Sequence, residues 1–193
     1  MCHLLPSSIP SCCGRSACGL SLKNIIHLTN WIVKRFAINA KESMNNSRGL
    51  TFDEFEIGAI YPSQARTVTE ADVVNFAGLS GDFNPLHTDA EFGKSTPMGE
   101  RIAHGVLILA MATGMANWMG IFEGTTIALM EQVTRYKGAV KFGDTIHLEM
   151  EVTEKKPTSK PDRGVVKFAV RVKNQRNEIV VEGEWTLLMK TKS

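Results

Sequence analysis

The spacing of apolar residues differs between two regions of the chain. Between residues 69 and 119 the apolar residues follow helical spacing or form continuous runs, whereas beyond Gly124 they occupy every second position. The first pattern is typical of helices, and the second is typical of strands that bury one face. We therefore expect helices in the first half of the folded region and a sheet in the second half.

Two short helices are predicted before the central one. Thr69 is placed to cap a helix that ends near Ala77 to Ser80, since acidic residues fill its first turn. A second helix is predicted over Ala90–Lys94, with Thr88 as its N-cap and Glu91 reaching back in a capping box.

The segment Ile102–Met119 is apolar on nearly every side. A helix with this composition is expected to be buried all round and to form the centre of the core. It is too short to span a bilayer, and no apolar run of the necessary ~18 residues occurs in the chain, so we expect no transmembrane helix.

The segments after this helix alternate between apolar and polar residues. One such segment has apolar residues at Ile146, Leu148, Met150 and Val152, and the same alternation recurs from Val166 to Lys173. With a short strand at Gln64–Val68 after a Tyr61-Pro62 turn, and further strands at Thr126–Tyr136 and Glu178–Lys190, about five strands are predicted. Short connections favour antiparallel neighbours, so the expected fold is α+β, with the sheet wrapped around the apolar helix.

Charge separates the first 49 residues from the rest. They carry six basic residues and one acidic residue, whereas residues 50–193 have a net charge of −3. All four cysteines (Cys2, Cys12, Cys13 and Cys18) also lie there, so the folded region is expected to use no disulfide and to occupy a reducing compartment. We expect an N-terminal extension, 1–49, and one domain, 50–193.

The extension allows three interpretations. A basic amphipathic pattern from Leu22 to Ile38 is compatible with a mitochondrial transit peptide, but a flexible extension or a translation start placed too far upstream would also explain it. The expected location is cytoplasmic, or mitochondrial if the extension is a genuine transit peptide.

The main candidate chemistry lies between the first two helices. Asp82 and His87 flank a segment that Pro85 prevents from being helical throughout, so a fixed turn can aim both side chains at one point. General acid–base chemistry is one interpretation; turn formation and a structural histidine are the alternative.

A second candidate lies at the start of the apolar helix. Backbone N–H groups at a helix start can stabilise a negative oxygen, and Gly105 would let a substrate carbonyl approach closely. Gly105 is therefore a candidate oxyanion hole, or only a tight turn. His104 is expected to support the loop structurally.

Other chemistry finds little support. The chain contains no phosphate-cradling loop, dinucleotide fingerprint, Ser-centred nucleophile motif or DNA-binding motif, so no nucleotide cofactor and no nucleic acid partner are expected. A metal site built from Asp82, His87, Asp89 and His104 is a minor alternative, because the spacing lacks the helical histidine pair of common zinc hydrolases.

Two motifs carry a family resemblance. Residues 81–89 read G-D-F-N-P-L-H-T-D, and residues 102–105 read I-A-H-G before the apolar helix. This resembles the MaoC-like dehydratases, including R-specific enoyl-CoA hydratases, over about residues 50–190. The family often has proline where this chain has Ala90.

The resemblance implies a hot dog fold, a homodimer, and reversible hydration of trans-2-enoyl thioesters of CoA or acyl carrier protein. It also implies that Asp82 and His87 share one water, with Asn84 supporting the loop or the water. A hot dog acyl-CoA thioesterase and a non-catalytic module that binds acyl thioesters are the alternatives.

Overall fold

A computed structural model describes residues 49–192. The predicted extension lies outside this range except for Gly49, so its interpretations and the expected location stay predictions. In the described part, no helix has the length and apolar character needed to cross a membrane. The elements in chain order are η1 (Phe52–Glu54), β1 (Ile60–Pro62), β2 (Arg66–Thr67), α2 (Glu70–Ser80), α3 (Pro85–Thr88), α4 (Ala90–Ser95), α5 (Gly105–Trp118), β3 (Thr126–Tyr136), β4 (Thr145–Pro157), β5 (Arg163–Lys173) and β6 (Ile179–Lys190).

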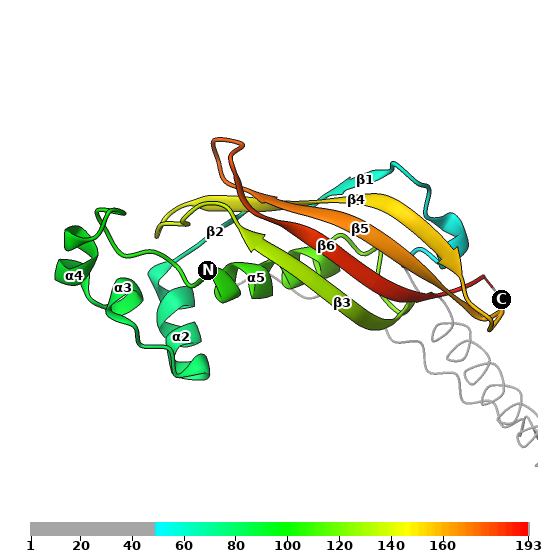
Figure 1. Cartoon of the computed structure of the whole chain (residues 1–193), viewed down its shortest axis with the longest axis horizontal. Coiled ribbons are helices and arrows are strands. Elements are labelled where there is room, and N and C mark those ends of the chain that lie inside the picture. The colour runs from blue at the N-terminus through cyan, green and yellow to red at the C-terminus, as the bar shows by residue number, and fades with distance from the viewer. Residues whose placement is uncertain (1–48, 193) are drawn as a thin grey trace, which may run out of the picture. The chain divides into compact units, whose positions relative to one another are not determined.

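An antiparallel sheet lies along α5 (Figure 1). Its strand order is β1-β4-β5-β6-β3, and the short β2 pairs with β4. This confirms the predicted α+β class and the predicted antiparallel pairing. Since β1 and β3 end the sheet, one edge of the long strand β3 pairs with no other strand of residues 49–192.

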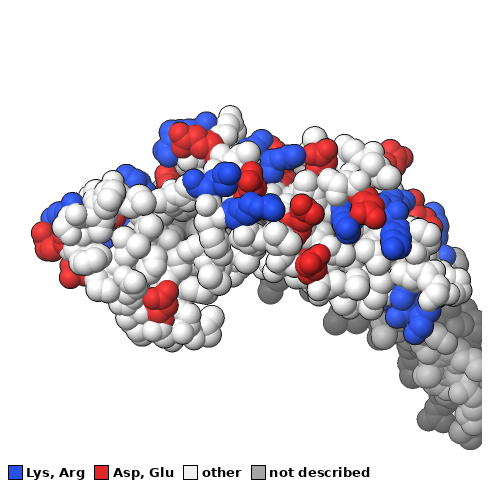
Figure 2. All heavy atoms as spheres, viewed as in Figure 1, with Lys and Arg blue, Asp and Glu red and all other residues white. Residues whose placement is uncertain are grey.

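The core fills the space between α5 and one face of the sheet. In β4 the predicted alternation holds, because Ile146, Leu148, Met150 and Val152 are buried. The alternate residues of β4 and β5 form ion pairs on the other face, such as Glu149 with Lys173 at 2.6 Å. Figure 2 shows charged side chains gathered over the sheet and a mostly uncharged surface over the helices below it.

The central helix differs from its prediction in two ways. It begins at Gly105 instead of Ile102, because Ile102 forms a β-bridge with Lys141 and the Ala103 N–H donates to the Val140 carbonyl. The expectation of burial all round is wrong as well. One stripe of α5 faces outward, and its ends, Val106 and Trp118, are each 58% exposed.

The first short strands also differ from the sequence prediction. Strand β2 is only Arg66–Thr67, and the expected Tyr61-Pro62 turn lies in a strand, β1. The sheet therefore has six strands instead of about five. Runs of two or three residues are too short to show a period, which explains the error.

Candidate active site

Helix α2 delivers the chain to the first candidate residue. Thr69 caps it as predicted, in a capping box with Asp72. Partial burial alone would raise the pKa of Asp72, but hydrogen bonds from the Thr69 N–H and hydroxyl, helped by the Arg66 guanidinium, outweigh it and hold this pKa below its ordinary value. The helix ends at Gly81, whose φ of 77° reverses the chain directly before Asp82.

A single-turn helix, α3, carries the second candidate residue. Asn84 caps it by accepting a hydrogen bond from the Leu86 N–H at 3.0 Å, and Pro85 occupies the first helical position. This helix is absent from the sequence prediction, although the Asn-Pro pair signals a cap followed by a first turn. Together, the turn at Gly81 and the capped helix α3 set the positions of Asp82 and His87, which are five residues apart.

The predicted cap of the next helix is wrong. Asp89 is the N-cap of α4, because its carboxylate accepts from the Glu91 and Phe92 N–H groups. The Thr88 hydroxyl instead donates backward to the Asn84 carbonyl at 3.1 Å. The Asp89 carboxylate therefore caps α4 and is not part of the cluster at the candidate site.

His87 is held in one orientation. Its Nδ1 lies 2.7 Å from the Ile102 carbonyl oxygen, so this nitrogen carries the hydrogen and donates it. The Nε2 atom is left to face the site. Asp82 is anchored on one side, since its Oδ1 accepts from the Asn84 N–H at 3.2 Å, and its side chain is 53% exposed.

His104 binds the two halves of the site together. Its Nε2–H donates to the Asp82 carbonyl at 2.9 Å, and its ring lies on that of His87, with centroids 3.8 Å apart and planes inclined by 30°. Phe76 packs against His104, with ring centroids 5.1 Å apart. His104 is only 2% exposed, and its Nδ1 finds no hydrogen-bond partner among the described residues.

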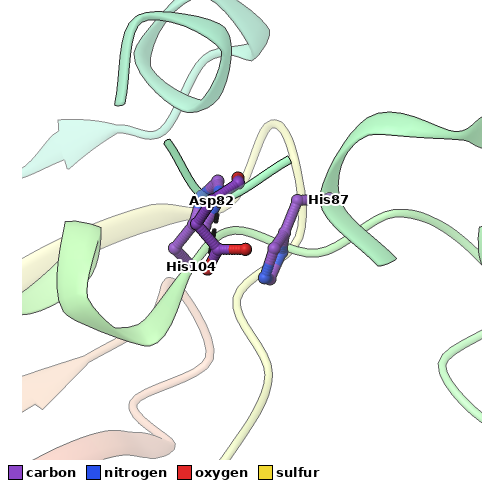
Figure 3. A group of neighbouring side chains, drawn as sticks. All are labelled: Asp82, His87 and His104. Carbon is purple, nitrogen blue, oxygen red and sulfur yellow. Dashed lines mark hydrogen bonds and ion pairs between the residues drawn. The ribbon is translucent and has the colours of Figure 1, made fainter. Parts of the chain in front are cut away.

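Asp82, His87 and His104 form one cluster (Figure 3). One polar side-chain atom of each lies within 4.8 Å of the others. The stacked rings argue against a shared metal, because the nitrogen lone pairs of near-parallel imidazoles run side by side instead of converging. The His104 Nε2 also carries a hydrogen for the Asp82 carbonyl, so this nitrogen is not available as a metal ligand in this arrangement.

A cavity of about 450 Å³ adjoins His87. Apart from His87, Tyr136 and Lys137, its lining side chains are apolar or glycine, and Gly105 is one of them. Asp82 is not part of the lining. The cavity therefore combines one candidate acid–base group with the candidate oxyanion residue.

Gly105 is the first residue of α5, and no side chain caps the helix there. Within the described range, no acceptor receives the Gly105 N–H. A Cβ at Gly105 would lie 2.8 Å from Cε1 and 2.9 Å from Cδ1 of Tyr136. A side chain at position 105 would therefore displace the Tyr136 ring, a contact that the sequence does not signal because Tyr136 is 31 positions away.

Comparisons with known proteins agree with the fold and the motifs. The family model described as MaoC like domain matches residues 55–174. The (R)-specific enoyl-CoA hydratase of Rhodospirillum rubrum is 31% identical over 127 residues, which cover 66% of this chain and 83% of that protein. The R-hydratase PhaJ1 of Pseudomonas aeruginosa, solved without ligand, is 34% identical with a TM-score of 0.64, covering 75% of this chain and 88% of its own.

A more distant structure bears on the fold alone. Rv0216 of Mycobacterium tuberculosis, described as a double hot dog fold, is 18% identical with a TM-score of 0.68, covering 75% of this chain and 45% of its own. The predicted hot dog arrangement, with α5 as the helix inside the sheet, is confirmed.

Proposed function

The chain belongs to the MaoC-like domain family, and on this premise we propose that it is a hydro-lyase acting on acyl thioesters. It reversibly adds water to trans-2-enoyl thioesters to give R-3-hydroxyacyl thioesters. The observation that carries the proposal is the pairing of Asp82 and His87 beside an apolar cavity that Gly105 also lines.

The acid and base roles follow from what each group can do. A carboxylate can only accept hydrogen bonds, whereas the Nε2 of imidazole either accepts or donates. In hydration, Asp82 takes a proton from water while the water oxygen bonds to C3, and His87, as imidazolium, gives a proton to C2. Solvent returns the proton from Asp82 to His87, because the Asp82 side chain is half exposed. Dehydration uses the same steps in reverse.

The thioester oxygen gains negative charge when C3 is attacked. We assign the free N–H of Gly105, at the positive end of α5, to this oxygen. Loss of one such donor typically costs ~10²–10³ in rate.

Asn84 and His104 support the site without reacting. Asn84 caps α3 with its side chain and donates its backbone N–H to the Asp82 carboxylate. His104 ties the Asp82 backbone to the start of α5 and supports the His87 ring from one face. Both fix the distance between the acid and the base.

The substrate carrier is CoA or acyl carrier protein. A panel of trans-2-enoyl-CoA substrates from C4 to C16, with matched acyl-carrier-protein substrates, tests the activity and ranks the carriers. Loss of the enoyl absorbance without release of free thiol supports hydration. Thiol release with the enoyl group intact would assign a thioesterase, and tight binding without turnover would assign a binding module.

The active form is a homodimer. Strand β3 is an edge strand of the described sheet, and its Ile127, Leu129 and Met130 are 39%, 45% and 58% exposed. Helix α5 exposes Val106 and Trp118. A long apolar edge strand favours pairing with another chain. A second copy would cover this surface.

Light scattering coupled to gel filtration tests this assembly. We expect a dimer for the wild type and a monomer for Met130→Glu. Ile57→Glu is the matched control, because Ile57 is 67% exposed beside β1, at the other edge of the sheet, and this variant should remain dimeric. A wild-type monomer at micromolar concentration contradicts the assignment.

A further inference from the structure

Tyr136 is placed where it can select substrates. It is the last residue of β3, it lines the cavity with His87 and Gly105, and it is 51% exposed. Its ring lies against the Gly105 Cα, in the space that a side chain at position 105 would fill. The reaction roles given above do not use it.

The proposed reaction brings the substrate to this ring. With the thioester oxygen about 2.9 Å from the Gly105 nitrogen, ordinary bond lengths place C2 within roughly 5 Å of that nitrogen. His87 must reach C2 from its own side of the cavity to deliver a proton. Because His87, Gly105 and Tyr136 line one cavity and the Tyr136 ring adjoins Gly105, a substrate that reaches both Gly105 and His87 would pass this ring.

Resting on the proposed function, we propose that Tyr136 determines specificity by closing the C2 side of the thioester site. The ring admits a hydrogen at C2 and excludes a methyl group there. The protein thus acts on enoyl thioesters unbranched at C2. Gly105 and Tyr136 form one unit in this account, because the glycine makes room for the ring.

Competing substrates test the proposal. The kcat/KM of trans-2-butenoyl-CoA is compared with that of its 2-methyl derivative in the wild type, Tyr136→Phe and Tyr136→Ala. One methyl group against a fitted wall is typically worth about 10–200-fold, so the wild type should prefer the unbranched substrate by that ratio. Tyr136→Phe should keep the ratio, and Tyr136→Ala should lower it at least about tenfold.

A second measurement tests the contact itself. Gly105→Ala should lower the melting midpoint by roughly 2–10 °C, because the new Cβ overlaps the Tyr136 ring. The same change made in Tyr136→Ala should lower it much less. Equal losses in both backgrounds would overturn the close packing on which the proposal depends.

The outcomes are distinguishable. Equal activity of the wild type on both substrates, or a ratio that Tyr136→Ala leaves unchanged, overturns the role of Tyr136 and leaves the hydratase intact. A wild type inactive on both substrates overturns the proposed function, and the specificity role with it.

Discussion

Replacing His104 by phenylalanine separates two contributions of its ring. The phenyl ring can still lie between Phe76 and His87, but the 2.9 Å hydrogen bond to the Asp82 carbonyl is lost. Activity and stability should respond differently, because the hydrogen bond, and not the ring packing, ties His104 to the turn that presents the Asp82 carboxylate.

The stability change should be small because two terms oppose each other. A neutral hydrogen bond contributes about 0.5–1.5 kcal/mol net. The variant also removes the buried Nδ1 of His104, which has no partner in the described residues, and leaving such an atom unsatisfied costs roughly 1–3 kcal/mol. We expect the free energy of unfolding to change by less than about 2 kcal/mol.

The activity change should be larger. Misplacing a reacting group by about 1 Å can cost ~10²-fold, so kcat for enoyl-CoA hydration should fall about 10- to 100-fold. Urea unfolding and steady-state hydration assays on the same preparation measure both quantities. Phe76→Leu is the control, since it changes the ring behind His104 and keeps the hydrogen bond.

Either of two results would refute this reasoning. An unchanged kcat would show that the Asp82 carbonyl needs no anchor. A loss of stability above about 3 kcal/mol would show that His104 acts mainly as core packing.

Further changes test the fold that supports the site. Asp72→Asn should remove about 0.5–2 kcal/mol at neutral pH, because the capping box with Thr69 weakens. Since the pKa of Asp72 is lowered in the folded state, its carboxylate stabilises the protein above about pH 4. The difference in free energy of unfolding between the wild type and the variant should therefore shrink below that pH, as urea titrations at several pH values would show. A difference that stays constant with pH would contradict this prediction. Gly183→Ala should prevent stable folding, since its Cβ would lie 1.9 Å from the Val133 carbonyl oxygen, and a soluble variant with a normal melting curve would disprove the contact. Gly78→Ala, in α2 with open space around it, should instead raise stability by about 0.5–1 kcal/mol in the same melting experiment, and a loss would show that a neighbour packs there.

The sequence predicted long elements well and short ones poorly. The periods in β4 and β5 run over enough residues to define a buried face, and Thr69 carries a local capping signal that fixes the start of α2. Strands β1 and β2 depend on contacts far away in the chain, so their residues alone do not determine them. Helix α3 is a single turn, which only the Asn84-Pro85 pair signals.

The exposed stripe of α5 was missed for a related reason. Most residues of α5 are apolar, so its composition indicates burial, but the sheet covers only part of the helix within one chain. A second copy would explain why Val106 and Trp118 are apolar. The error in the sequence prediction thus points to the proposed dimer.

The candidate site was partly predictable. Pro85 and the turn around it explain why Asp82 and His87 can meet, and the structure brings their side chains together. Stacking of His87 on His104, and the approach of Tyr136 to Gly105, arise from tertiary packing between distant segments. No local sequence signal marks them.

The central claim is that Asp82, as the base, activates one water for addition to an enoyl thioester, and that His87, as the acid, protonates C2. Its most direct test is the hydration rate of trans-2-butenoyl-CoA by Asp82→Asn and His87→Ala, with unfolding curves to show that both variants remain folded. We predict that each loses at least about 10²-fold in kcat, the usual contribution of general acid–base assistance, without loss of the fold. Near-wild-type hydration by either folded variant would contradict the account.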